Sequence, residues 1–82
     1  MNITLKLFSS LMEYLPGGAI GNSVEIKLTQ PVSTAALIER YKIPLKAVQV
    51  VMVNGEFQSP DSRSDLLADG DKVSIWPAIQ GG

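Results

Sequence analysis

The chain opens on a strict alternation of apolar and polar side chains. In the segment NITLKLF, Ile3, Leu5 and Leu7 share one face, while the residues between them share the other face with Phe8. A period of two is typical of a β-strand with one buried face. The same alternation in SVEIKLT (23–29) predicts a second strand. Its short spacing from the first strand leaves room for an antiparallel neighbour.

The end of the chain has the same pattern. The segment KVSIWPAI (72–79) places Val73 and Ile75 on one side and Trp76 on the other, which predicts a last strand. Proline has no backbone N–H to donate, so regular pairing should end at about Pro77.

Helical spacing replaces alternation in two segments. The first, SSLMEYL (9–15), predicts a short helix with Ser9 or Ser10 as its N-cap. The second, STAALIERYKI (33–43), predicts a helix that begins after the N-cap Ser33. Both segments are short, so we expect only two short helices.

A hairpin is predicted in the third quarter of the chain. The segment VQVVMVNGEF (48–57) is apolar on both faces and breaks at Asn54-Gly55, which is the strongest short signal for a two-residue hairpin turn. A polar connection follows, and its Leu66 and Leu67 are expected to plug the core.

The predicted order is β, α, β, α, β, β, β, with no repeats or linkers. An α+β fold with a mixed sheet of about five strands and its helices on one face is the economical packing. With the first and last strands side by side at the centre, this is a β-grasp (ubiquitin-like) fold. We expect residues 1–77 to form this domain and residues 78–82 to be a flexible C-terminal tail. The predicted core contains Leu5, Leu7, Val24, Ile26, Leu37, Tyr41, Val51, Val53, Leu67, Val73 and Ile75.

Composition narrows the function classes. The chain has 82 residues, 45% of them hydrophobic and 18% charged, which indicates one small globular domain. The formal net charge is −1 and the basic residues do not cluster, so we expect no nucleic-acid partner. No apolar run is long enough for a membrane span, and the N-terminus does not look like a signal peptide. We therefore expect a cytoplasmic protein with no membrane partner.

Cysteine and histidine are both absent from the chain. The commonest nucleophile, general base and transition-metal ligands are therefore missing, and we expect neither catalytic residues nor a metal site. Asp69 and Asp71, which flank Gly70, are interpreted as turn residues because two carboxylates alone make a poor metal site. The GGAIG run (17–21) is interpreted as a helix end and turn, since it lacks the lysine of a phosphate loop.

Four apolar residues point away from the predicted core: Phe8, Val50, Met52 and Trp76. Two short helices should cover only one face of the sheet, which leaves these side chains on an apolar patch. Such patches usually mark partner surfaces. The alternative is a loop folded over the patch.

The chain ends in AIQGG (78–82), directly after the proline that should end the last strand. Glycine has no Cβ, so Gly81 and Gly82 could thread a narrow channel and present a sterically open carboxylate. The terminal carboxylate is then a candidate reactive group in a chain with few others.

These features together resemble a known family. The stretch VNGEF…LLADGDKVSIWPAIQGG is similar to the ubiquitin-like sulfur carriers of the MoaD/ThiS family. The helix in LFSSLMEYL and the ending WPAIQGG resemble the MoaD branch, the small subunit of molybdopterin synthase. The segment IPLKAVQVVMVNG is closer to thiamin-type relatives.

The resemblance implies a carrier and not an enzyme. The carboxylate of Gly82 would be adenylated by an E1-like adenylating enzyme and converted to a thiocarboxylate that donates sulfur in molybdopterin (molybdenum or tungsten cofactor) biosynthesis. ATP would be used by that partner, and no cofactor would be bound by the carrier. The tail Ile79, Gln80 and Gly81 would enter the active site of the synthase large subunit or another acceptor enzyme. The residues implied to bind the partner are Phe8, Val50, Met52, Trp76 and Pro77.

Two other functions compete with this one. Thiamin-type carriers use the same chemistry for another acceptor, and protein modifiers attach the same diglycine to lysines. A third possibility is an interaction module in which the diglycine is incidental, which would keep its function without Gly81 and Gly82.

Overall fold

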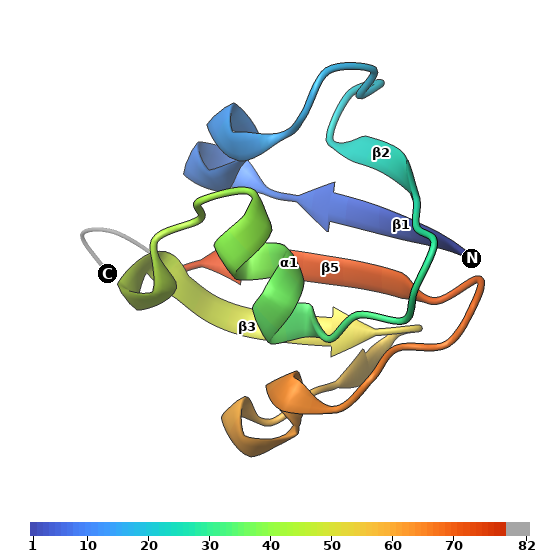
Figure 1. Ribbon diagram of the computed structural model, residues 1–82. Helices are drawn as coiled ribbons and strands as arrows, with labels where there is room; N and C mark the ends of the chain where they lie inside the picture. Colours follow the sequence, from blue (N-terminus) through green and yellow to red (C-terminus); the bar gives the residue numbers. More distant parts are fainter. Residues whose placement is uncertain (79–82) are drawn as a thin grey trace.

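A computed structural model describes residues 1–78 (Figure 1). This part of the chain forms one five-stranded sheet, a short α-helix and three short 3₁₀ helices. The strands are β1 (Asn2–Leu7), β2 (Ser23–Lys27), β3 (Val48–Val53), β4 (Glu56–Phe57) and β5 (Lys72–Pro77). The helices are η1 (Ser9–Tyr14), α1 (Thr34–Arg40), η2 (Leu45–Ala47) and η3 (Pro60–Ser64).

The sheet has the order β2-β1-β5-β3-β4. The first and last strands lie side by side and run parallel, with Leu5 opposite Val73 and Leu7 opposite Ile75. The other pairs are antiparallel. The mixed sheet is that of a ubiquitin-like β-grasp, as the sequence predicts. Pairing of β5 ends at Pro77, which lies opposite Val48.

The core lies between the sheet and α1, which crosses the face turned toward the viewer in Figure 1. The alternating residues predicted to be buried are buried, because the period of two keeps them on this face. Tyr41 and Val53 are exceptions: both are partly buried at the margin of the core. Leu66 and Leu67 were both expected to fill the core. Leu67 is buried, but Leu66 is 71% exposed, so only Leu67 does so.

The two predicted helices have different outcomes. In α1, the Ser33 Oγ accepts a hydrogen bond from the Ala36 N–H at 3.0 Å, so the predicted N-cap is correct. The segment after β1 is a 3₁₀ helix whose N-cap is Phe8, with no capping side chain, so the prediction of a serine cap is wrong. Ser9 takes the left-handed conformation (φ 54°) that turns the chain out of β1, and Leu11 reaches the core.

The predicted hairpin turn joins β3 to β4. Asn54 (φ 55°) and Gly55 (φ 82°) both lie in the left-handed region, as a type I′ turn requires. The turn is tied to the loop before β5, because Asn54 Nδ2 donates to Asp71 Oδ1 at 2.8 Å and the Lys72 N–H donates to Asn54 Oδ1 at 2.9 Å.

The two aspartates that flank Gly70 are turn residues, as predicted. Asp69 Oδ1 accepts from the Asn2 N–H at 2.6 Å, and Asp71 Oδ2 accepts from the Ala68 N–H at 2.8 Å. Gly70 has a φ of 87°, which favours glycine. The carboxylates are therefore used to hold the loop between η3 and β5.

Candidate functional site

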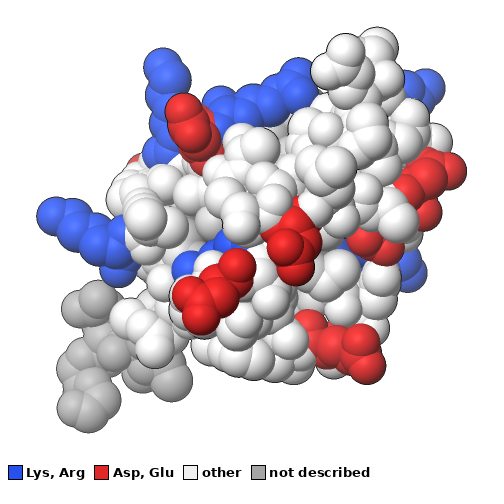
Figure 2. Space-filling view, turned by 60° about the horizontal axis from the view of Figure 1, so that its bottom comes forward, with Lys and Arg blue, Asp and Glu red and all other residues white. Residues whose placement is uncertain are grey.

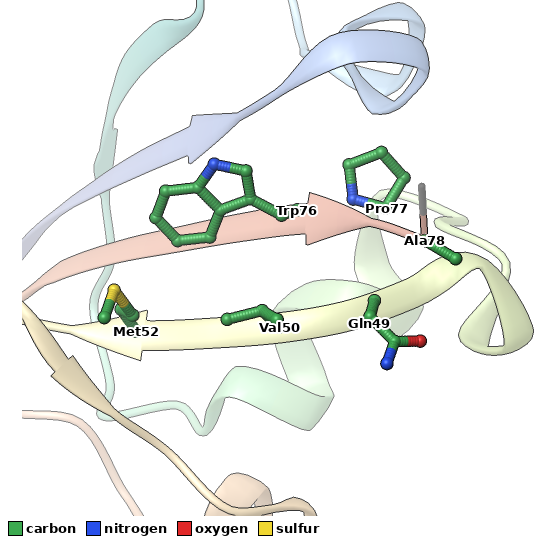
Figure 3. A pocket seen from close by; sticks show the side chains of 6 residues that line it. All are labelled: Gln49, Val50, Met52, Trp76, Pro77 and Ala78. Carbon is green, nitrogen blue, oxygen red and sulfur yellow. The ribbon is translucent and has the colours of Figure 1, made fainter. Parts of the chain in front are cut away.

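An apolar groove runs along the sheet face that α1 leaves uncovered. We call it the sheet-face groove. Its lining residues are Gln49, Val50, Met52, Trp76, Pro77 and Ala78. Figure 3 views them from the side opposite to Figure 1, with α1 behind the sheet.

Strand register builds this groove. Val50 lies directly opposite Trp76 in the antiparallel pair of β3 and β5, and opposite residues point to the same side of a sheet. Met52 is on the same face one pleat further along β3. All three side chains are partly exposed. The lining comes from β3, β5 and the residue after β5, and no other described segment contributes to it.

Phe8 reaches the same surface from the other side of β5. Its ring stacks on that of Trp76 with a centroid separation of 4.3 Å and an interplanar angle of 9°. The backbone holds the pair together, because the Phe8 N–H donates to the Ile75 carbonyl at 3.2 Å. Aromatic pairs of this kind contribute about 0.5–1.5 kcal/mol beyond their buried area. The stack fixes the orientation of the Trp76 indole, one residue before β5 ends at Pro77.

The five residues that the sequence analysis named as partner-binding are thus brought onto one surface. Sequence reasoning missed Gln49, because a register shift between Val48 and Val50 places it at an irregularity of β3. The spacing of three between the buried Val48 and Val51 reflects that irregularity. The sequence did carry one indication of this irregularity, because Gln49 is the only polar residue in the apolar segment VQVVMV.

A scan against protein-family models matches residues 5–82 to the ThiS family. The chain belongs to the ThiS family. The match covers nearly all of the chain, and it confirms the resemblance to the MoaD/ThiS sulfur carriers. A comparison with curated protein sequences found no match.

Three solved structures show the same fold as this ThiS-family chain. One is SAMP1 from Haloferax volcanii, with a TM-score of 0.66, 20% identity and 100% of both chains covered. A second, the complex of subunits 1 and 2 of molybdopterin-converting factor from Helicobacter pylori, has a TM-score of 0.61, 18% identity and the same full coverage. A third, described as a putative molybdopterin converting factor subunit 1 from Pyrococcus furiosus, has a TM-score of 0.67 and 23% identity and covers 95% of this chain and 98% of its own.

In the ThiS-family chain the groove extends to the last described residue. Ala78 follows β5 directly and is itself part of the lining. The proposed roles of Ile79, Gln80, Gly81 and Gly82 fall on residues outside the described part of the chain. The groove is therefore the part of the candidate site whose geometry is defined.

Charge adds little to the surface of the ThiS-family chain. On the face drawn in Figure 2, acidic side chains are spread over the surface and basic side chains lie mainly at its margins, with uncharged atoms between them. Within residues 1–78, no group of three or more acidic side chains could hold a metal ion. The same residues include no helix that is long and apolar enough to cross a membrane. The distinctive surface feature is the apolar groove.

Proposed function

We propose that this ThiS-family chain carries sulfur as a thiocarboxylate on Gly82 and donates it in molybdopterin biosynthesis. The observation that carries the proposal is the position of the sheet-face groove at the end of β5. Residues 79–82 lead from the groove to the carboxylate that the proposal assigns to Gly82. Four extended residues span at most about 14 Å. A partner seated on the groove could therefore receive the carboxylate in its own active site.

The proposed chemistry needs no reactive side chain in the carrier. A carboxylate is a poor electrophile, so a carboxylate oxygen first attacks the α-phosphorus of ATP and pyrophosphate leaves. Hydrosulfide (HS⁻) from a sulfur donor then attacks the carbonyl carbon of the acyl-adenylate and AMP leaves. The product is a –COSH group. This division of labour accounts for a chain that contains neither cysteine nor histidine.

Two partners follow from this proposal. The first is an adenylating enzyme that binds ATP, and the second is a sulfur acceptor enzyme. The acceptor is supported by the Helicobacter pylori neighbour, which is a complex of subunits 1 and 2 of molybdopterin-converting factor. We place the acceptor, a molybdopterin synthase large subunit, on the sheet-face groove.

The proposal is tested by reconstitution. The purified chain is incubated with a candidate adenylating enzyme, ATP and a sulfur donor, and ATP–pyrophosphate exchange and intact mass are measured. We expect exchange, followed by replacement of one oxygen by sulfur and formation of molybdopterin when a synthase large subunit and precursor are added. Sulfur transfer only to a thiamin-type acceptor would reassign the pathway. Isopeptide-linked ladders without sulfur gain would instead support a protein modifier.

The groove has its own prediction. Trp76→Ala is expected to weaken binding to the adenylating enzyme or the synthase subunit by about 2 kcal/mol or more, because the indole is a partly exposed aromatic at the centre of the surface. This corresponds to roughly a 30-fold higher Kd. The measurement is isothermal titration calorimetry with each partner.

The matched control is Ile20→Ala, which removes an apolar side chain that is 86% exposed and does not line the groove. It should leave both affinities unchanged. The Trp76 variant should retain a cooperative unfolding transition, with a loss of about 0.5–1.5 kcal/mol from the aromatic stack in addition to the loss of the buried area of the indole. Equal binding by Trp76→Ala and wild type would remove the groove from the partner interface.

A further inference from the structure

A second groove lies on the side of the sheet that carries α1, between α1, η2 and η3. We call it the helix-side groove. Its apolar part is formed by Ala35 and Ile38 of α1, Ile43 of the following turn, Leu45 of η2 and Pro60 of η3. Arg63, Ser64 and Glu39 complete the lining. It shares no residue with the sheet-face groove.

The walls of the helix-side groove are held in place by backbone hydrogen bonds. The Ile43 N–H donates to the Ile38 carbonyl at 3.0 Å, which fixes the turn after α1. The Leu67 N–H donates to the Val32 carbonyl at 2.8 Å, which ties the segment after η3 to the start of α1. A partner would therefore meet a formed groove and would not have to order it, which lowers the cost of binding.

The groove leaves an apolar side chain in water. Leu45 is 67% exposed, although Ile38 and Ile43 beside it are buried. A partner side chain packed between Leu45 and Pro60 would remove this surface from water, at about 25 cal/mol per Å² of apolar area.

Arg63 determines which polar group a ligand of the groove should carry. Its Nε is enclosed and has no acceptor within the described residues. An enclosed N–H without a partner is unfavourable, and a guanidinium is best matched by a carboxylate that accepts two parallel hydrogen bonds. Arg63 also lines the groove, so its guanidinium is the cationic group that a segment bound there would meet. Arg63 therefore calls for a carboxylate.

Glu39 also lines the groove, but it does not make a basic ligand group preferable to a carboxylate. Its side chain is exposed and already solvated, so a basic group on a partner would gain little from it. Arg63 is partly buried, so the carboxylate that satisfies it gains more.

We propose that the helix-side groove binds an extended peptide segment of a partner protein that presents an apolar side chain next to an aspartate or glutamate. The apolar side chain packs between Leu45, Ile43 and Pro60, and the carboxylate accepts hydrogen bonds from Arg63. The site is independent of the sulfur-carrier proposal, because it uses neither the sheet-face groove nor Gly82. Both surfaces could be occupied at once.

The test is an NMR titration of the isotope-labelled full chain with two capped peptides, acetyl-Leu-Leu-Asp-amide and acetyl-Leu-Leu-Asn-amide. We expect saturable shifts at the methyl groups of Ile38, Ile43 and Leu45 and at the Arg63 Nε–H. The aspartate peptide should bind about fivefold more tightly, because a charge-assisted hydrogen bond exceeds a neutral one by about 1 kcal/mol. Arg63→Gln should remove this difference, and Leu45→Ser should weaken both peptides.

Arg40→Gln is the matched control, since Arg40 is an exposed arginine at the end of α1 that does not line the helix-side groove. It should bind both peptides like the wild type, and dispersed amide spectra will show that each variant is folded. Equal affinities of the wild type for the two peptides, or shifts confined to Val50, Met52 and Trp76, would overturn the proposal. Deletion of Gly82 should leave peptide binding unchanged, which separates this result from a failure of the carrier function.

Discussion

Deletion of Gly82 is expected to reduce ATP–pyrophosphate exchange to background and to prevent any gain of sulfur. The proposed reaction takes place at the carboxylate of this residue, so its removal shortens the arm and places Gly81 at the reacting position. Gly82→Ala should also slow the reaction severely, because a Cβ beside the reacting carbon narrows the accessible conformations and would crowd the narrow partner channel that the proposal requires. Both effects should be seen with saturating adenylating enzyme and ATP.

The fold should be unaffected by either change. Residue 82 follows the end of β5 at Pro77 in the sequence, and the described core is formed without it. We therefore expect a change in the free energy of unfolding of no more than about 0.5 kcal/mol. The measurement is a urea titration followed by Trp76 fluorescence. A loss of exchange without a loss of stability is the expected combination.

Gly17→Ala provides a matched glycine control. A Cβ built at Gly17 meets no atom within 4 Å, and the position has no left-handed φ. This variant should retain exchange, sulfur gain and stability. If the chain without Gly82 still supported exchange and acquired sulfur, the carrier proposal would be wrong and the incidental-diglycine module would replace it.

Ile75→Ala is expected to lower the free energy of unfolding by about 2–5 kcal/mol. Ile75 is fully buried in the central strand β5, between Leu7 of β1 and Val51 of β3. Its truncation removes apolar burial and leaves a cavity that these paired strands cannot close without breaking their register. A small domain has only about 5–15 kcal/mol in total, so this one change removes a large share.

The measurement is the urea midpoint together with its slope. Ile75→Val should cost only about 0.5–1.5 kcal/mol, because it removes one methyl group. Ser74→Ala, on the opposite face of the same strand, should change stability by no more than about 0.5 kcal/mol. An unchanged midpoint for Ile75→Ala would contradict the buried position of this side chain.

Alternation alone was enough to predict β1, β2 and β5. In a strand with one covered face, burial follows the period of two, so the buried set can be identified without knowing the neighbours. The hairpin of β3 and β4 was predictable for a local reason too, because Asn54-Gly55 suits the left-handed turn that joins two twisted strands. Ser33 caps α1 through a contact within a single turn. The family was also recognisable, because most of the residues that carry the resemblance lie in two short segments of the last third of the chain.

Long-range packing decided the remaining features. The register shift before Val50 arises from the pairing of β3 with β5, and it adds Gln49 to the sheet-face groove. Phe8 was assigned to the correct face, but its stack on Trp76 depends on the parallel pairing of the first and last strands. Leu66 and Leu67 are adjacent and equally apolar, yet only Leu67 faces the core. The helix-side groove is formed by α1, η2 and η3, which only the tertiary fold brings together. The same packing encloses the Arg63 Nε without an acceptor among residues 1–78. No local sequence pattern encodes which distant side chains will meet.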